Sequence, residues 1–556
     1  MSVVMKKHIV LIVISFSFLI SFLSCADNSN ESNKRIVFAI PSDVTTFSPL
    51  YAFNANEGNI TELIYLGLVE HKWDGDIGDL TTSPMLAESW LWSDDSLSLT
   101  VELRNDVYWS DSVQFNAHDI VFTFDLYSDA KVNSRFYGQF KNFYTNDDLS
   151  INTQKSFEVL SPFKIKINFN KNSSPTLFDI SYPLLPKHIF EKTPRDEMAN
   201  AEVNLSPVGT GPYKLLSWEK NQFIKLVKNE NSIFYNESII PELIFKVVPD
   251  YNARINQLKN GEVDFADEIK SNDVDALIQN GNIKIESQKG RNYDYVGWNN
   301  IDPEKFANNK IEPNKFFGNK NVRKALSYAV NSKIILEEFL DNYGELAVGP
   351  IAPIFKNSIN QDLEPVPFDL EKAKQILENE GWKDSNLNGT IDKNGIEFSF
   401  ILNIPGGNPL RNYTSTIIKD NLKNIGIAVS IESVEPQVFW GNVFARKYDA
   451  WIAGWMVPIP LSLKPFWHSD LKNNPVNLTG YNNNEADILL EKTEKNISKE
   501  EMNNVYKEIQ NMLYNDAPVT FLFWKDNITA YNKKINGVSI DPLGVIHKCW
   551  NWSISN

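Results

Sequence analysis

The side chains that carry out chemistry in enzymes form no recognisable motif in this sequence. A G-x-S-x-G elbow, a Walker A loop and a C-x-x-C pair are all missing. The six histidines form no H-E-x-x-H motif and no pair at i, i+4, which a zinc hydrolase would need: His8, His71, His118, His188, His468 and His547. The sequence therefore gives no support for an enzyme and predicts no cofactor.

One segment has the spacing of a cation-binding loop. Oxygen-bearing side chains stand at positions 1, 3, 5 and 9 of an EF-type loop, with Gly389 at position 6. Position 12, which should supply a bidentate glutamate, is Gly395. The alternative interpretation is a β-turn rich in asparagine and glycine. The candidate calcium ligands are Asp384, Asn386, Asn388 and Asp392.

Composition predicts a folded protein that does not bind nucleic acid. The chain has 556 residues, enough for several domains, and 42% of them are apolar, 22% charged and 12% aromatic. It carries 54 basic and 70 acidic residues, a formal charge of −16. Because phosphate backbones attract cationic surfaces, this charge has the wrong sign for a nucleic-acid partner.

The N-terminus predicts export. Lys6 and Lys7 precede a run of apolar residues and serines over residues 9–23, so residues 1–24 are expected to be a signal peptide. Cys25 follows at once and resembles the lipidated cysteine of a bacterial lipoprotein, with residues 25–33 as a tether. The alternative is an ordinary secretory signal, with Cys25 and Cys549 either bonded to each other or free.

The hydrophobic pattern alternates between the period of strands and that of helices, which indicates an α/β protein. Residues 97–103 alternate as a half-buried strand, and residues 322–330 have the spacing of an amphipathic helix. Asp369 can cap a further helix that ends at Gly381. Residues 418–425 predict a helix that feeds directly into a strand over residues 427–431.

Several spaced blocks stand in order between about residues 36 and 552. They are LAESW at 86–90, LR at 103–104, WSD at 109–111, AHDIVF at 117–122, GTGPY at 209–213, LKNGEVD at 258–264, VRKALSYAVN at 322–331 and KYDAWIAGW at 447–455. Together they resemble the family 5 extracellular solute-binding proteins, the peptide, nickel and oligosaccharide receptors of ABC importers.

This resemblance implies a fold and a domain organisation. We expect an α/β, two-lobed fold like the type II periplasmic binding proteins, with an accessory subdomain inserted in the first lobe. The implied boundaries are 34–76, 205–298 and 525–556 for lobe 1, 77–204 for the accessory subdomain and 299–524 for lobe 2. The chain would cross between the lobes near residues 298–299 and 523–524.

The resemblance also implies a ligand site, with one departure. Peptide-binding members carry an aspartate three residues after the G-W tryptophan, where it pairs with the ammonium group of the peptide. Here Pro458 stands at that position, so this anchor is missing. Arg411 can bind a carboxylate through two parallel hydrogen bonds. The implied ligand-binding residues are Phe53, Asn54, Ala55, Asn56, Trp298, Asn299, Gly406, Asn408, Arg411, Trp440, Trp455, Met456 and Val457.

The function implied is that of a receptor for an ABC importer. The protein would capture an oligopeptide-like solute between closing lobes and deliver it to the membrane permease, as a monomer anchored by lipid on the outer face of the cell membrane or in the periplasm. An oligosaccharide or another neutral solute is the alternative, because Pro458 removes the ammonium anchor. A nickel chelate, with His468 as its histidine, a secreted polymer hydrolase and a surface interaction protein also stay open.

Overall fold

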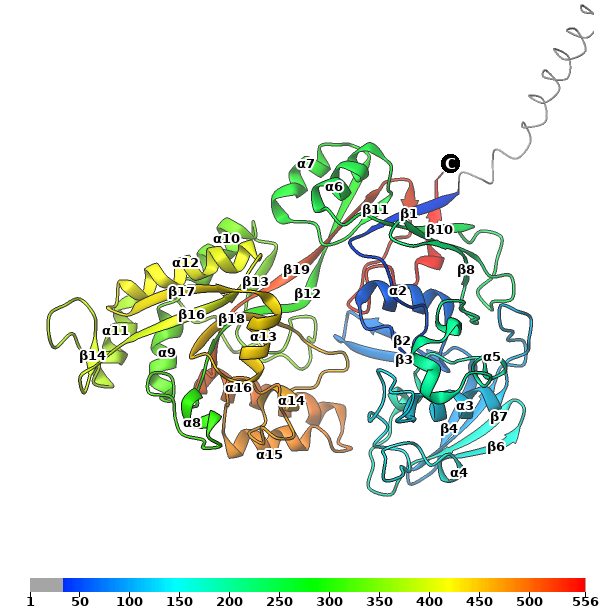
Figure 1. Cartoon of the computed structure of the whole chain (residues 1–556), viewed down its shortest axis with the longest axis horizontal. Coiled ribbons are helices and arrows are strands. Elements are labelled where there is room, and N and C mark those ends of the chain that lie inside the picture. Colours follow the sequence, from blue (N-terminus) through cyan, green and yellow to red (C-terminus); the bar gives the residue numbers. More distant parts are fainter. Residues whose placement is uncertain (1–33, 556) are drawn as a thin grey trace, which may run out of the picture.

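The computed structural model describes residues 34–555. The predicted signal peptide, Cys25 and the whole of the predicted tether lie outside this range. Two lobes stand side by side, and two long strands, β12 (Ile283–Trp298) and β19 (Val519–Asn532), run from one lobe to the other (Figure 1). Within residues 34–555, no helix is long and apolar enough to cross a bilayer.

A single sheet of eleven strands passes through both lobes. Its order is β17-β16-β18-β12-β19-β11-β1-β10-β9-β8, and β13 also pairs with β19. Lobe 1 contributes β1 (Arg35–Ile40), β8 (Tyr213–Glu219), β9 (Phe223–Lys228), β10 (Glu242–Val247) and β11 (Phe265–Ala266). Lobe 2 contributes β13 (Gly344–Leu346), β16 (Ser399–Pro405), β17 (Ala428–Val434) and β18 (Ala450–Met456). The two crossing strands therefore join the lobes by backbone pairing, and no loose linker is needed.

The rest of lobe 1 is built on this half of the sheet. Its helices are α2 (Ala55–Ile64), α6 (Tyr251–Asn260) and α7 (Val274–Ile278), and β20 (Ile535–Asn536) pairs with β21 (Ser553–Ile554). A hairpin of β2 (Val69–Asp74) and β3 (Asp79–Pro84) leads into a separate four-stranded sheet. That sheet and its helices comprise β4 (Ala87–Trp92), β5 (Ser98–Leu103), β6 (Phe157–Ser161), β7 (Lys164–Asn168), α3 (Ala117–Ser128), α4 (Thr153–Ser156) and α5 (Lys187–Phe190).

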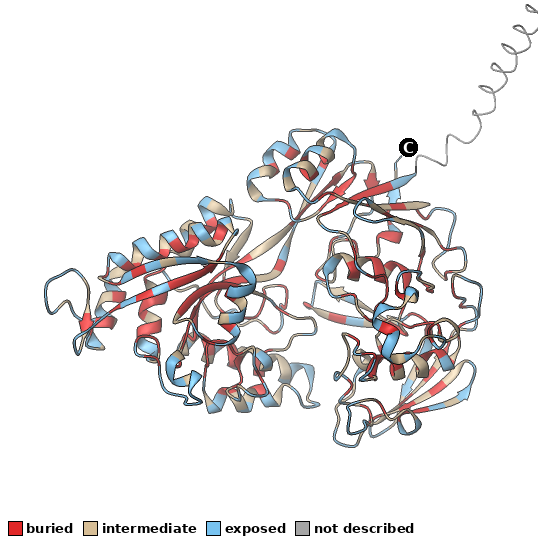
Figure 2. Ribbon diagram, viewed as in Figure 1, coloured by how far each residue is buried: buried red, intermediate tan, exposed pale blue. Residues whose placement is uncertain are grey.

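Helices cover both faces of the sheet in lobe 2. They are α8 (Pro303–Ala307), α9 (Lys320–Tyr328), α10 (Ser332–Phe339), α11 (Leu370–Asn379), α12 (Pro409–Lys423), α13 (Pro436–Phe444), α14 (Lys464–Trp467), α15 (Asn484–Lys492) and α16 (Lys499–Asp516). A small hairpin joins β14 (Asp392–Lys393) to β15 (Ile396–Glu397). Buried residues concentrate in the strands and on the helix faces that pack against them (Figure 2).

Local sequence signals account for several of these elements. The predicted helix over residues 322–330 is α9, and Val322, Ala325 and Leu326 form its buried stripe. Asp369 caps α11 by accepting a hydrogen bond from the Lys372 amide. The residues around Gly426 form the predicted passage from α12 to β17. The hydrophobic pattern and the capping residues therefore predicted those elements that local interactions stabilise.

The structure places the lobe crossing earlier in β12 than the sequence predicted. β12 pairs with β18 over residues 292–298, and Trp298 lies in the core of lobe 2. The pairing of β12 with β19 is interrupted between Gln288 and Asn292, where the two strands shift register. Such an irregularity is where a paired ribbon bends. The change of lobe in β12 therefore falls near residues 288–292, and not at the predicted 298–299.

The two lobes also touch away from the crossing strands, through the β2–β3 hairpin of lobe 1. The rings of Trp73 and Phe355 meet edge to face with centroids 5.5 Å apart. Asp79 Oδ2 lies 2.8 Å from Lys499 Nζ. A further ion pair joins Lys141 of lobe 1 to Glu494 of lobe 2 at 3.7 Å. We call these contacts the lobe clasp.

Candidate functional site

The carboxyl ends of parallel strands meet in the region between the lobes. In lobe 1, β1 runs parallel to β10 and β11, and in lobe 2, β16 runs parallel to β17 and β18. Open α/β sheets bind ligands beyond the carboxyl ends of such strands. Residues 41–56, 267 and 406–411 follow these strands, and residues 455–458 form the end of β18 and the turn after it. We call them, together with the side chains around them, the interlobe site.

The start of α2 brings the predicted residues 53–56 to this site. The Asn54 side chain accepts a hydrogen bond from the Glu57 amide, and the Glu57 carboxylate accepts in return from the Asn54 amide. The Asn56 amide donates to Ser42 O at 3.1 Å. Phe53 is 75% exposed, and Ala55 is also exposed. The asparagines thus first serve the fold, whereas Phe53 and the backbone offer contact surface.

Asp267, which directly follows β11, is a carboxylate that the sequence analysis missed. It is half-buried, and no ion pair or side-chain hydrogen bond joins it to another described residue. Burial, followed by the charge of Glu268, raises the pKa of Asp267 to about 6. Side chains whose pKa is strongly shifted and that line a cleft are candidates for functional groups.

Asp267 lines a small cavity at the carboxyl end of β1. The cavity has a volume of about 20 Å³, which is room for one water-sized group. Asn56 and Asn59 of α2 contribute amides to its wall, and aromatic rings of the sheet form its floor. An ammonium group is water-sized and donates three hydrogen bonds, so this cavity has the size and the acceptors to receive one. The lining residues are Phe38, Ala39, Ile40, Asn56, Asn59, Phe245, Phe265, Asp267, Val545 and Ile546.

Lobe 2 presents the opposite charge. Asp294 on β12 is buried, and its two oxygens lie 3.1 Å from Arg411 Nε and 3.0 Å from Lys525 Nζ. Burial alone would raise the pKa of Asp294, but Lys525 and Arg411 together hold it below its ordinary value. Gly454 leaves space for this cluster, because a Cβ there would lie 2.5 Å from Asp294 Oδ1. One carboxylate thus faces two cations, which leaves one positive charge uncompensated.

Arg291 adds a third cation close by. Its guanidinium donates to Val457 O, and its carbonyl accepts from the Val457 amide at 2.9 Å. Burial lowers the pKa of Arg291, and no acidic side chain in the described part of the chain pairs with it. Arg411 stands in the first turn of α12, whose N-terminus favours negative charge. The lobe 2 side of the site is therefore suited to a carboxylate.

An apolar wall adjoins these cations. Trp455 lies between Trp440, with ring centroids 6.0 Å apart, and Phe466, at 5.3 Å. Met456 is 57% exposed. Trp455, Met456, Val457 and Pro458 line a narrow cavity of about 10 Å³. The side chains at the end of β18 and directly after it can thus pack against an apolar group, and none of them carries charge.

Two predicted site residues do not reach the interlobe site. Trp298 has no exposed surface, packs in the core of lobe 2 and donates from Nε1 to Thr520 Oγ1 at 2.9 Å. Asn299 is equally buried, and its amide donates to the carbonyl of Tyr448 at 2.9 Å. Both residues stabilise lobe 2, since a buried polar side chain must be hydrogen-bonded.

The predicted residues on the α12 side follow β16, and two of them make hydrogen bonds that serve the fold. Asn408 caps α12 by accepting from the Arg411 amide at 3.1 Å. Gly406 donates its amide to Val434 O at 2.7 Å. The guanidinium of Arg411 is the group here that can hold a ligand, because its Nη atoms make no hydrogen bond among the described residues.

The cation-loop candidates act as turn acceptors. Asp384 accepts from the Asn388 and Gly389 amides at 3.1 and 2.9 Å. Asp392 accepts from both the amide and the hydroxyl of Ser385. Asn386 and Asn388 likewise accept from backbone amides within the loop. No group of three acidic, histidine or cysteine side chains able to hold a metal occurs within residues 34–555. The loop thus corresponds to the predicted turn and gives the calcium hypothesis no support.

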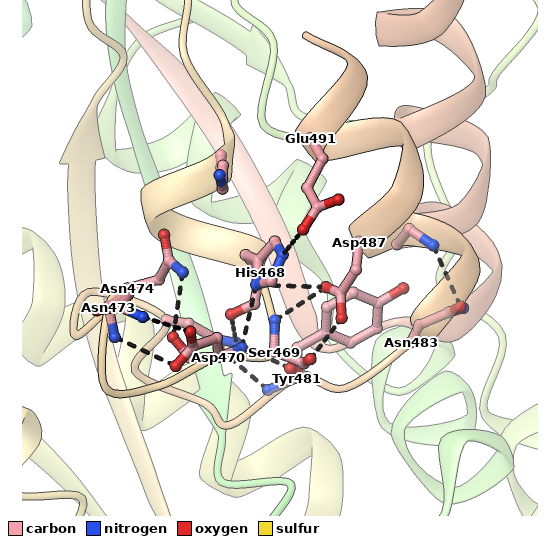
Figure 3. Close-up of polar contacts among 12 residues, drawn as sticks. His468, Ser469, Asp470, Asn473, Asn474, Tyr481, Asn483, Asp487 and Glu491 are labelled. Carbon is pink, nitrogen blue, oxygen red and sulfur yellow. Dashed lines mark hydrogen bonds and ion pairs between the residues drawn. The ribbon is translucent and has the colours of Figure 1, made fainter. Parts of the chain in front are cut away.

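His468, the histidine considered for a nickel chelate, is enclosed by acidic side chains of α15 (Figure 3). It is 8% exposed, with Nδ1 3.8 Å from Asp487 Oδ1 and Nε2 3.4 Å from Glu491 Oε1. Nδ1 also accepts from the Asp470 amide at 3.1 Å. These contacts hold the segment after α14 against α15, so the imidazole already has its partners within lobe 2.

Sequence reasoning missed Asp267, Asp294 and Lys525. A signal existed for Asp267, because an acidic pair directly after the short strand of the GEVD block places a carboxylate at a strand end. Nothing comparable marks Asp294 and Lys525, which lie 231 residues apart and meet only because β12 and β19 pair.

Comparison with known proteins agrees with this architecture. The profile of the bacterial extracellular solute-binding proteins, family 5 (middle region) matches residues 81–477. The oligopeptide-binding protein AppA of Bacillus subtilis is 28% identical over 560 residues, covering 97% of each chain. Its solved structure, in complex with a nonapeptide, superposes with a TM-score of 0.72 at 27% identity and covers 94% of this chain and 99% of that one. NikZ of Campylobacter jejuni in complex with Ni(L-His) gives a TM-score of 0.73 at 26% identity, with the same coverage.

Proposed function

Because the chain belongs to the bacterial extracellular solute-binding proteins of family 5, whose relatives are substrate-binding proteins of ABC importers, we propose that it is an importer receptor that captures an oligopeptide between its lobes. The peptide would be held as a zwitterion. Its ammonium group would lie at Asp267 on lobe 1, and its carboxylate at Arg411 on lobe 2.

The observation that carries this proposal is the opposite charge of the two facing strand ends. Asp267 is a half-buried carboxylate without a partner, beside a cavity for one water-sized group. Arg411, Lys525 and Arg291 outnumber Asp294 on the other lobe. Charged groups removed from water are stable only when paired, and a zwitterion spanning the two lobes would pair both ends. Asp267 would thus bind the ammonium group of the ligand, which Pro458 cannot do.

The same contacts argue against the alternative solutes. A neutral sugar would need free amide groups, but the side-chain oxygen of Asn54 already accepts from the Glu57 amide and the side-chain amide of Asn56 already donates to Ser42. A nickel chelate would need a free imidazole, but His468 is buried between carboxylates. The relative with a bound nonapeptide supports a peptide, since AppA is similar to this chain over nearly its full length.

Capture would proceed as a population shift. A ligand that touches both lobes favours the form in which they meet, by the free energy of the contacts that only this form allows. The lobe clasp, which includes the Trp73–Phe355 pair, would add stability to the closed form. The permease and its ATPase subunits would then receive the ligand from the closed receptor.

We further propose that the receptor is exported, anchored through a lipid on Cys25 and active as a monomer outside the cytoplasm. The support is the sequence signal at residues 1–25, which lies outside the described range. Cell fractionation tests the anchor. The Cys25→Ser substitution should release the protein from membranes.

A thermal-shift screen tests the ligand class. The protein without residues 1–25 is mixed with di- to pentapeptides, with cello- and xylo-oligosaccharides, and with nickel–histidine. A ligand present at about 100 times its Kd stabilises the folded state by roughly 2.7 kcal/mol, a clear shift in Tm. We expect peptides alone to raise the Tm. A shift with sugars or with nickel–histidine, and none with peptides, would contradict the proposal.

A further inference from the structure

Lobe 2 contains a larger cavity that the interlobe site does not use. Its volume is about 520 Å³, within the range of small-molecule sites. Four segments enclose it: the end of α9 with the turn to α10, the loop 365–368, the end of α16, and residues 519–522 of β19 beside β13. All of these segments belong to lobe 2. The cavity is therefore present whether or not the lobes meet.

The walls of this cavity are mostly apolar. Leu346 and Val348 come from β13 and the residues after it, and Phe521 comes from β19. The loop adds Val366 and Phe368, of which Phe368 is 41% exposed. An apolar body placed here is removed from water on several sides, which is the main favourable contribution to binding such a group.

The charged side chains of the lining are all basic. None of the described residues that line the cavity is acidic, although the whole chain carries a net charge of −16. Two lysines contribute to the lining. Lys333 is exposed and pairs with Glu337 at 3.6 Å, whereas Lys324 is partly buried and has no ion pair or hydrogen bond within residues 34–555. Lys324 is thus a cation held against an apolar cavity without a counter-charge.

Two phenol hydroxyls stand in the same lining. Lys372 Nζ lies 4.2 Å from the ring centroid of Tyr328, and Tyr514 makes no side-chain hydrogen bond to other described residues. Burial, more than the neighbouring Tyr328, raises the pKa of Tyr514, so its hydroxyl stays protonated and can donate. The lining therefore offers the unpaired ammonium of Lys324 and two hydroxyl donors, and Glu364, beside the loop, is the acidic side chain whose charge acts on Tyr514.

We propose that this cavity is a second binding site, which takes an amphipathic carboxylate with an unbranched or aromatic apolar body. The carboxylate pairs with Lys324 and accepts from Tyr328 or Tyr514. The apolar body lies against Leu346, Val366 and Phe521. The site is separate from the proposed peptide site, and the inference does not depend on it.

Isothermal titration with a charge series of one chain length tests this site. Decanoate, decanol and decylamine share their apolar body and differ in the head group. We expect decanoate to bind most tightly and decylamine not at all. The Lys324→Met variant keeps the apolar stem of the side chain, so its affinity for decanoate should fall roughly ten- to hundredfold, the range of a charge-assisted hydrogen bond, while its affinity for decanol stays the same.

Two further variants separate the site from non-specific binding. Lys333→Met removes the other lysine of the lining, which is already paired, and should leave decanoate affinity unchanged. Val366→Trp fills the cavity from the loop and should abolish binding of both decanoate and decanol. Peptide binding in all three variants should match the wild type, which shows that they fold.

Absence of decanoate binding to the wild-type protein would overturn the proposal. Equal decanoate affinity in Lys324→Met and wild type would overturn the role of Lys324. Unchanged binding in Val366→Trp would place the amphiphile elsewhere.

Discussion

The indole of Trp73 in lobe 1 meets the ring of Phe355 in lobe 2 edge to face, with centroids 5.5 Å apart. Trp73 is carried by β2, and Phe355 by the loop after β13. Because the pair joins one side chain of each lobe, it forms only when the lobes approach each other. It thus provides a contact by which closure can be tested without touching the proposed ligand site.

Replacement of Trp73 by alanine should weaken peptide binding without unfolding lobe 1. An edge-to-face pair contributes about 0.5–1.5 kcal/mol beyond the burial of its surface, so the affinity should fall roughly two- to tenfold or somewhat more. Titration calorimetry measures the change. The matched control is Trp92→Ala, which removes a ring that packs on Phe169 within lobe 1 alone. Equal losses in both variants would show that the clasp has no part in capture.

Gly78 offers a second test of closure. Its φ is +64°, and a Cβ on it would lie 2.3 Å from Ile354 O and from Lys356 N of lobe 2. Gly78→Ala should therefore bar the closed form and lower peptide affinity by more than about tenfold. Gly281→Ala is the control for backbone strain alone, because its φ is +78° and nothing lies within 4 Å of its Cβ position. Both variants should lose about 1–2 kcal/mol of stability, and we expect only Gly78→Ala to lose affinity.

Asp294 should be the residue of the interlobe site on which stability depends most. Asp294→Asn leaves Arg411 and Lys525 without their carboxylate, and removal of one partner of a buried pair costs roughly 3–5 kcal/mol. Urea denaturation measures this loss. Asp106→Asn breaks an exposed pair with Arg104 and should cost about 1 kcal/mol or less.

The pH dependence of that loss follows from the pKa of Asp294, which is lower in the folded protein than in the unfolded chain. A depressed acid pKa stabilises the fold above the unfolded value, and this stabilisation is lost as the pH falls through the folded value. The difference between wild type and Asp294→Asn should thus be largest at neutral pH and shrink below about pH 4. A difference that stays constant across this range would contradict the ion-pair account.

Asp267, whose pKa is shifted in the opposite direction to that of Asp294, should make peptide binding depend on pH near 6. Its pKa is raised to about 6, mainly by burial, so the carboxylate is ionised at pH 7.5 and largely protonated at pH 5. An ammonium ligand needs the ionised form. Peptide affinity should therefore fall as the pH drops through about 6, and Asp267→Asn should flatten this profile. The same substitution removes a charge that burial makes unfavourable in the folded protein. It should therefore raise the Tm of the ligand-free protein at pH 8, where Asp267 is ionised, and not at pH 4.

Much of the fold could be predicted from the sequence because its signals are local. The amphipathic spacing of α9, the Asp369 cap of α11 and the order of the sequence blocks each depend on residues close together in the chain. The site could be predicted only in part. Arg411 was predicted from the family resemblance alone, whereas Trp298 was assigned to the ligand although its side chain belongs to the core. Strand register, which decides this, depends on partners hundreds of residues away.

The charges of the site show the same limit. The role of Asp294 depends on its ion pairs with Lys525 on β19 and Arg411 on α12. The role of Asp267 follows from the absence of any such partner among the described residues and from a cavity formed by five segments that are separate in the sequence. A single sequence gives the types of these residues, but it does not give their mutual distances.

The most direct test of the account is whether Asp267 recognises the ammonium group of a peptide. Calorimetry at pH 7.5 would compare tetra-alanine with N-acetyl tetra-alanine on the wild type and on Asp267→Asn. We predict that acetylation weakens binding to the wild type by about tenfold or more and has little effect on binding to the variant. An equal loss on both proteins would contradict the account, because the ammonium group would then be held elsewhere.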